Sequence, residues 1–404
     1  MGKQAFEGVK VADFSWAATG PEVARLLANL GAEVIHIESN THLDLLRTTG
    51  PYRDNVMGIN KTNFFAQYNG NKYGISLNLR HPRGAEIARR IVFWSDIVIE
   101  SFMPGTIEHL GLGYDELSKA KPTIIMFSTC NQGQTGPQTK RVGLGTQLTG
   151  ASGLHHFCGW PDRGPSLVWG AYTDFVSIPL GAAFLIAALD YQHRTGKGQH
   201  LDMSQIEATL QFLAPQLLDY SVNKRIAGRA GNRCSWAAPH GVFQCHGEDS
   251  WCAIAVFTDE EWQSLCKVIG NPEWTKDAKF STLLARKENE DELESLINDW
   301  TGGLTPTEVM SKLQAEGVAA GVVQNCQDIQ EDIQLNHRHQ FWEMEHPEMG
   351  KHHYEAPSFI LSKTPAEPRR PAPCLGEHNT YVYTQVLGIS DDEFVELLAD
   401  GVFE

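Results

Sequence analysis

The sequence predicts an α/β protein with a Rossmann-like parallel sheet and an inserted smaller α/β domain. The first observation is a buried strand, a helix and a second buried strand at residues 9–14, 21–29 and 32–37. Such a βαβ unit of about 30 residues pairs its two strands in parallel. The second observation is that this alternation continues after residue 84, and the third is that it returns beyond residue 250.

The elements follow one another in a simple order. The first helix has apolar residues at helical spacing and ends before Gly31. The capping-box residues Thr305 and Glu308 predict another helix start, and Ser390 is the expected cap of a final acidic helix. Between these we expect helices over 84–94, 260–269 and 287–300, and strands over 97–100, 123–128 and 251–256. The loop over residues 15–21 lacks the G-x-G-x-x-G pattern, so the sheet does not imply a dinucleotide.

A basic, glycine-containing stretch without periodicity marks the change between the domains. We expect a large-domain part over 1–220, a linker over 221–233, a small domain over 234–325 and a C-terminal segment over 326–404 that returns to the large domain. The chain is Pro-rich and is expected to be irregular from residue 345 to 376.

Charge and hydropathy exclude several classes of function. The net charge of −16 over 404 residues disfavours binding to nucleic acid or to an anionic membrane, because phosphate groups would repel the chain. The longest apolar run, residues 175–189, is shorter than a bilayer span and contains Pro179. No segment resembling a signal peptide follows Met1. We therefore expect a cytoplasmic protein that binds neither nucleic acid nor membrane.

The cysteines and histidines do not indicate a metal site. The eight cysteines lie singly, without a C-x-x-C pair, which suits a reducing compartment. The histidine pairs at 155–156 and 352–353 lack further ligands at a suitable spacing. We expect no bound metal.

Asp174 is the candidate with the most consequence. An aspartate just ahead of an apolar helical run is commonly an N-cap. Pro179 weakens this interpretation, because a proline beyond the first turn removes a helix hydrogen bond. The helix is expected to begin near Ile178 with Ser177 as its cap, which leaves Asp174 in the preceding loop. The residues alone leave a cap and a nucleophile equally open.

The whole sequence resembles the class III CoA-transferase family, also called CaiB/BaiF-like, which includes formyl-CoA transferase and carnitine CoA-transferase. The most specific pieces are Gly133-Gln134-Thr135-Gly136-Pro137 and Arg194-Thr195-Gly196-Lys197-Gly198-Gln199. Further matching segments occur in the same order at residues 8–14, 20–21, 30–35, 69–72, 104–106, 317–321 and 370–378.

The resemblance implies that Asp174 is the nucleophile, because family members carry a catalytic aspartate at this distance before the T-G-[KR]-G-Q turn. Asp174 would attack an acyl-CoA to form a mixed anhydride, and CoA thiolate would convert the anhydride into an aspartyl-CoA thioester. Backbone N–H groups would stabilise the oxyanions. The reaction implies no permanently bound cofactor, and the CoA thioester is a substrate.

The resemblance also implies a CoA site at the carboxyl ends of the parallel strands. The residues carried over to it are Ala17, Ala18, Thr19, Asn71, Lys72, Ser101 and Phe102. Of these, Lys72 is expected to contact phosphate and Phe102 to pack against adenine, although each is also typical of an ordinary surface lysine or core aromatic.

Departures from the family pattern move part of the phosphate binding elsewhere. Ser39 and His109 stand where arginine is common, Ser101 where asparagine is common, and residues 130–132 replace a Ser-Gly-Phe run. Other basic residues are therefore candidates for the phosphates: Arg47, Lys140, Arg141, Lys224, Arg225, Arg229 and Arg233. Candidates for the acyl pocket are Trp16, Phe127, Asn131, Gln132, Tyr172, Trp236 and Phe243.

The resemblance implies an interlocked homodimer, and a hetero-oligomer stays open. A roomy acyl pocket would take an aromatic or dicarboxylic acid such as benzylsuccinate, with succinyl-CoA as donor. Oxalate is disfavoured, because residues 237–241 replace the glycine-rich loop of formyl-CoA transferases. Two other functions remain: an α-methylacyl-CoA racemase, whose second base would be a histidine where this chain has Leu144, and a non-catalytic acyl-CoA-binding subunit.

Overall fold

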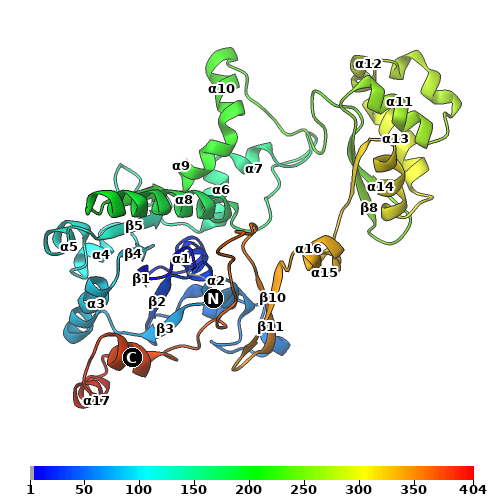
Figure 1. The fold of residues 1–404 in the computed structure, drawn as a ribbon. Helices are drawn as coiled ribbons and strands as arrows, with labels where there is room; N and C mark the ends of the chain where they lie inside the picture. The colour runs from blue at the N-terminus through cyan, green and yellow to red at the C-terminus, as the bar shows by residue number, and fades with distance from the viewer. Residues whose placement is uncertain (1–3) are drawn as a thin grey trace. The chain divides into compact units, whose positions relative to one another are not determined.

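The computed structural model describes residues 4–404, which form two compact units (Figure 1). The first unit runs to His155 and takes in Leu167–Ile226 and Gln334–Glu404. The second unit comprises His156–Ser166 and Ala227–Ile333. The change from the first unit to the second at Ile226 falls within the basic stretch that was interpreted as a linker.

A six-stranded parallel sheet forms the centre of the first unit, which confirms the predicted α/β class. Its order is β3-β2-β1-β4-β5-β6, so the strand order reverses between β1 and β4. Ligands of open α/β sheets usually bind at the carboxyl ends of the strands beside such a reversal. The strands are β1 (Lys10–Asp13), β2 (Glu33–Glu38), β3 (Tyr73–Ser76), β4 (Ile97–Glu100), β5 (Ile125–Cys130) and β6 (His200–Ser204).

Helices cover both faces of this sheet, because successive side chains of a strand point to opposite faces. Val11 packs with the helices Thr19–Asn29 and Tyr172–Thr195 on one face, and its neighbour Ala12 packs with the helix Pro82–Trp94 on the other. The helices of the first unit are α1 (Thr19–Asn29), α2 (Asn63–Asn69), α3 (Pro82–Trp94), α4 (Thr106–His109), α5 (Tyr114–Ala120), α6 (Gly145–Ala151), α8 (Tyr172–Thr195), α9 (Gln205–Leu210), α10 (Ala214–Asn223) and α17 (Asp391–Ala399). The short helices α7 (Leu154–Phe157) and α16 (Ile333–His337) lie where the units join in sequence.

Helix α8 begins earlier than predicted. Its first residue is Tyr172 rather than Ile178, and Ser177 is not a cap, since its hydroxyl donates to the Thr173 carbonyl at 2.6 Å. The first turn is held by tertiary bonds, because the Thr173 hydroxyl donates to the Gly145 carbonyl at 3.1 Å. These contacts outweigh the local cost of Pro179 inside the helix.

The same helix is longer than the apolar run suggested. Its 24 residues, with a mean hydropathy of 1.6 over the most apolar window, are long and apolar enough to cross a membrane by length and composition. One face is nevertheless part of the protein core, where Ile178, Leu185 and Leu189 pack against the sheet. Core helices of globular proteins commonly have this composition.

The second unit has a three-stranded antiparallel sheet in the order β7-β8-β9, covered by helices. Thr305 and Glu308 form the capping box that the sequence predicted. The elements are β7 (His240–Gln244), β8 (Trp251–Ala255), β9 (Ala319–Val322), α11 (Asp259–Val268), α12 (Leu283–Glu288), α13 (Glu290–Thr301), α14 (Pro306–Ala315) and α15 (Cys326–Glu331).

The C-terminal segment is more ordered than its proline content indicated. An antiparallel hairpin of β10 (Phe341–His346) and β11 (Gly350–Glu355) packs against α2. The chain then returns to the sheet, where the Tyr383 hydroxyl donates to the Ser76 carbonyl at 2.7 Å. Ser390 caps α17 as expected, accepting the Glu393 N–H.

Candidate active site

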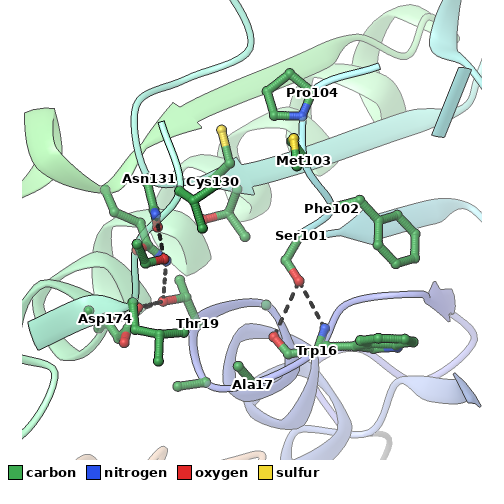
Figure 2. A pocket seen from close by; sticks show the side chains of 18 of the residues that line it. Trp16, Ala17, Thr19, Ser101, Phe102, Met103, Pro104, Cys130, Asn131 and Asp174 are labelled. Atoms are coloured by element: carbon green, nitrogen blue, oxygen red, sulfur yellow. Dashed lines mark hydrogen bonds between the residues drawn. The ribbon is translucent and has the colours of Figure 1, made fainter. Parts of the chain in front are cut away.

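A cavity of about 260 Å³ lies at the carboxyl ends of β1, β4 and β5, beside the reversal of strand order (Figure 2). This volume is just below the range for small-molecule sites, roughly 300–1,000 Å³, so it suits the reacting end of a ligand rather than all of CoA. The lining residues are 16–20, 101–104, 129–131, 139–145, Asp174 and Gln205.

Asp174 lies in the first turn of α8 and is not its cap. Ala171 occupies the cap position, and no side chain caps this helix. The Thr19 hydroxyl lies 3.3 Å from Oδ1 of Asp174, and the Gln205 Nε2 donates to that hydroxyl at 2.8 Å (Figure 2). Because the Thr19 oxygen accepts from Gln205, its own proton is free to be donated to Asp174. The three residues thus form a chain that orients the carboxylate.

The pKa of Asp174 is raised to about 6 by burial, and the hydrogen bonds from Thr19 and Gln205 lower it in part. Within residues 4–404, no lysine, arginine or histidine forms an ion pair with this carboxylate. The group is therefore mostly ionised at pH 7 and is not neutralised by a nearby cation. Such a carboxylate is more basic than an exposed one and is suited to nucleophilic attack.

Gly145 allows the carboxylate to occupy this position. A Cβ at residue 145 would lie 2.3 Å from Oδ2 of Asp174 and 2.3 Å from Cβ of Ala171. No side chain fits there without moving the aspartate. The cavity contains a second potential nucleophile, Cys130, but burial raises the pKa of its thiol to about 11, so it is protonated at neutral pH.

The loop after β1 is held in place by two buried carboxylates. Asp13 accepts the Ser15 N–H at 3.1 Å, and Asp44 accepts the Ala17 N–H at 3.1 and 3.2 Å. Ala17 has a φ of 63°, which is uncommon for a residue with a side chain. These bonds fix the path that brings Thr19 to Asp174.

The loop after β4 is tied to this first loop. The Trp16 N–H donates to Oγ of Ser101 at 2.9 Å, and the Ser101 hydroxyl lies 3.2 Å from the Trp16 carbonyl (Figure 2). The rings of Trp16 and Phe102 meet edge to face at 5.9 Å. Both aromatic residues also line a second cavity of about 250 Å³, which extends past the ends of β2 and β3.

Five of the seven residues proposed for CoA therefore line the cavity with Asp174: Ala17, Ala18, Thr19, Ser101 and Phe102. Asn71 and Lys72 do not. Lys72 is fully buried, and its ammonium donates to Asp13 and to Asn69, both at 2.8 Å. Asn71 is buried as well and donates to Oδ1 of Asn29 at 2.7 Å. Both residues support the loops rather than face the cavity.

The other basic residues proposed to bind the phosphates also fall into two groups, those that line the cavity and those that do not. Arg47 is buried in a bidentate pair with Glu38, whereas Lys140 and Arg141 line the cavity. Neither of these two cations pairs with a carboxylate in the part of the chain that the structure describes. In the second unit, Arg233 pairs with Asp291 and Glu294.

The linker candidates Lys224 and Arg225 follow α10, and Arg229 bonds the His156 carbonyl.

The acyl-pocket candidates are only partly brought together. Trp16 and Asn131 line the cavity, and the amide of Asn131 donates to the Gly143 carbonyl at 2.8 Å. Phe127 is part of β5 and its side chain packs against α8, and Phe243 lies in the core of the second unit. Gln132, Tyr172 and Trp236 are not among the lining residues.

Sequence reasoning missed Thr129, Gly145 and Gln205, which carry no motif of their own. The repeated glycines at 143 and 145 are the one local signal of a close backbone approach. Within residues 4–404, no group of three or more His, Cys, Asp or Glu side chains is arranged to hold a metal ion.

The chain is similar to several known proteins. The model of CoA-transferase family III matches residues 6–379. A probable CoA-transferase of Mycobacterium tuberculosis is 33% identical over all of this chain, which spans about half (51%) of that relative. The succinyl-CoA–D-citramalate CoA-transferase of Chloroflexus aurantiacus is 30% identical over 98% of this chain and 97% of its own. The crystal structure of a CAIB/BAIF family protein from Brucella suis superposes with a TM-score of 0.87 at 29% identity, covering 95% of this chain and 100% of that one.

Proposed function

The chain belongs to CoA-transferase family III, which confirms the resemblance in its motifs, and on that premise we propose that it transfers CoA between carboxylic acids with Asp174 as the covalent nucleophile. The observation that supports this role is the carboxylate itself. It is half-buried at the cavity wall, oriented by Thr19, unpaired with any cation in residues 4–404, and has a pKa raised to about 6.

The chemistry proceeds in four balanced exchanges. The Asp174 carboxylate attacks the acyl carbon of the donor thioester and forms a mixed anhydride, and CoA leaves as a thiolate. The thiolate attacks the Asp174 carbonyl, which gives an aspartyl-CoA thioester and releases the donor acid. The acceptor carboxylate then attacks this thioester and forms a second anhydride. The released thiolate attacks the acceptor acyl carbon, which gives the new acyl-CoA and regenerates the carboxylate.

The residues around Asp174 fit these exchanges. The amide N–H groups of Ala18, Thr19 and Gly20, at the start of α1, have no acceptor among residues 4–404, and these residues line the same cavity as Asp174. We assign to them the stabilisation of the oxyanions formed at each exchange. The protonated Cys130 thiol does not compete for the acyl group.

CoA is proposed to lie across both cavities. Its thioester end would enter the cavity of Asp174, and its adenine would pack at the second cavity, which shares Trp16 and Phe102 with the first. Arg80 lines the second cavity, and Lys140 and Arg141 line the first, so these three cations are the proposed phosphate partners in place of Lys72.

A dicarboxylic acceptor with succinyl-CoA as donor is the substrate pair that we propose. A relative that is 30% identical bears the name succinyl-CoA–D-citramalate CoA-transferase. Benzylsuccinate adds an aromatic group to the same dicarboxylic frame and belongs in the same test panel.

No observation favours a racemase. The position of its second base is Leu144, and none of the residues that line the cavity is a histidine. Moving an α-proton between two faces requires a second base of this kind.

A second copy of the chain is the proposed partner. Helix α10 buries none of its side chains, and α8 exposes apolar residues on the face turned away from the sheet. Exposed apolar patches of this kind mark protein interfaces. The exposed residues are Phe184 and Ile186 of α8, Phe212 just before α10, and Leu217, Leu218 and Val222 of α10. A homodimer in light scattering, dissociated by Leu218→Asp, is the expected result, and a monomer for the unaltered chain contradicts it.

The test of the nucleophile uses hydroxylamine. The protein is incubated with succinyl-CoA and then with hydroxylamine, and its peptides are analysed by mass spectrometry. A hydroxamate at Asp174 that depends on the acyl-CoA is the expected result. Transfer at the normal rate by Asp174→Asn, or a hydroxamate elsewhere, would overturn the assignment.

A further inference from the structure

Thr129 differs from the other buried threonines of the first unit. It lies on β5, one residue before the strand ends, and only 1% of its surface is exposed. Its hydroxyl oxygen has no hydrogen-bond partner among residues 4–404. By contrast, the hydroxyls of buried Thr149 and Thr209 donate to backbone carbonyls at 2.7 and 2.9 Å. An unpaired buried hydroxyl is unfavourable in the free protein and is usually retained for a reason.

Thr129 lines the cavity of Asp174. Its depth in this cavity relative to Asp174 follows from its position on β5 and from the contact of β5 with α8. Phe127 packs against α8, because a Cβ at Gly181 would lie 2.9 Å from its ring. Side chains two residues apart share a face of a strand, so Thr129 faces α8 as well. Two strand residues span about 6.6 Å, which equals about four residues of a helix.

The direction of α8 shows which part of this helix lies opposite Thr129. A helix that connects parallel strands runs opposite to them, so moving along β5 from Phe127 to Thr129 leads from Gly181 back toward Ser177. Thr129 is therefore about one helical turn deeper than Asp174. By this geometry Thr129 contributes to the floor of the cavity, below the carboxylate of Asp174.

We propose that Thr129 is a specificity residue whose hydroxyl binds an oxygen on the chain of the acyl group, either a hydroxyl or a second carboxylate. This inference rests on the proposed transferase function, and it concerns the part of the acid that reaches the floor rather than the reacting carboxyl. The Thr129 hydroxyl is already removed from water, so it loses little when it binds an oxygen of the substrate. An apolar substrate chain would leave this hydroxyl unpaired and is therefore disfavoured. The substrate class is thus a short acid with an oxygen-bearing chain.

The experiment compares acceptors that differ in a single group, with succinyl-CoA as donor. Citramalate is compared with methylsuccinate, which lacks the hydroxyl, and glutarate with pentanoate, which has a methyl group in place of the second carboxylate. In Thr129→Val, the ratio of kcat/KM for the oxygen-bearing acid to that of its partner should fall about tenfold or more in one pair. Unchanged ratios in both pairs would overturn the proposal. Thr129→Ser should restore the ratio.

Two controls separate selectivity from folding. Thr129→Val should unfold at the same temperature as the unaltered chain or higher, because the hydroxyl has no partner to lose. Thr209→Val should unfold at a lower temperature, because its hydroxyl bonds the Gln205 carbonyl, yet keep both ratios. A loss of selectivity by Thr209→Val equal to that of Thr129→Val would count against the proposal.

The proposed function can fail separately. If the unaltered chain transfers CoA to none of the acids, the transferase assignment fails. Binding of the same acids is then compared by the rise in unfolding temperature that each one causes. A rise for citramalate or glutarate that Thr129→Val removes supports the role of Thr129, and an equal rise in both proteins overturns it.

Discussion

Replacing Thr19 with valine should move the acid limb of the pH profile upward. The Thr19 hydroxyl is oriented by Gln205 and lies 3.3 Å from Oδ1 of Asp174, and this bond lowers a pKa that burial has raised to about 6. Valine keeps the shape of the side chain but removes the donor. The ionised carboxylate then loses a favourable contact that its protonated form does not need, so the pKa of Asp174 rises.

The size of the effect follows from the geometry. A hydrogen bond to a charged group contributes about 1.5–3 kcal/mol. The 3.3 Å separation is long for such a bond, so a value near the lower limit, about 1.4 kcal/mol or one pKa unit, is appropriate. At pH 6 the ionised fraction falls from about one half to about one eleventh, roughly a fivefold loss of activity, whereas at pH 8 the loss is below about 10%.

The assay measures kcat/KM for CoA transfer from pH 5 to pH 9 in the unaltered chain, in Thr19→Val and in Thr19→Ser. Serine retains the donor and should keep the acid limb near pH 6. Thr301→Val is a matched control in the second unit, since its hydroxyl bonds the Gln244 carbonyl far along the chain from the cavity. An acid limb that stays in place or moves downward in Thr19→Val would refute the role of this bond.

Three further changes test the neighbourhood of the cavity. Gly145→Ala should lower kcat about 100-fold without unfolding the protein, because the added methyl displaces the carboxylate; a normal kcat contradicts this. Lys72→Met should destabilise the fold by about 3–5 kcal/mol in urea, because Asp13 is left buried without its partner. A normal unfolding midpoint with a raised KM for acyl-CoA would instead make Lys72 a CoA ligand. Asp174→Asn should be more stable than the unaltered chain above pH 6 by up to about 3 kcal/mol, since a raised pKa makes the ionised form costly there. This gain should shrink as the pH falls toward 4, and a gain that does not change with pH contradicts the cause.

The sequence was sufficient for the elements whose signals are local. The strand at Ile97–Glu100 and the helices that begin with Thr305 and Ser390 as caps occur where they were predicted. Apolar runs, caps and boxes act over a few residues and remain valid in any tertiary context. The parallel sheet followed from the βαβ alternation for the same reason.

The predictions that failed depend on contacts between distant residues. Pro179 argued for a late start of α8, but Thr173 bonds Gly145 and holds the first turn in helical form. That Lys72 binds a phosphate stays a prediction, and the contact that weakens it is also distant, because its ammonium reaches Asp13, 59 residues away in the chain. A motif locates a residue in the fold without giving the direction of its side chain. The hairpin of β10 and β11 was hidden by the prolines that follow it.

Asp13 and Asp174, both near the carboxyl ends of the strands, differ in a way that supports the proposed role of Asp174. Asp13 contacts Lys72 and His36, and these partners hold its pKa well below its usual range. These partners stabilise the ionised form of the carboxylate, but they also lower its basicity and therefore its reactivity as a nucleophile. Asp174 has only the neutral donors Thr19 and Gln205, so burial raises its pKa to about 6. A lysine beside Asp174 would stabilise the folded protein and weaken the attack on a thioester. Asp174 has no cation partner in the described chain, although the fold partly buries and orients its carboxylate. This absence distinguishes the proposed nucleophile from the structural Asp13 more clearly than its position in the sequence does.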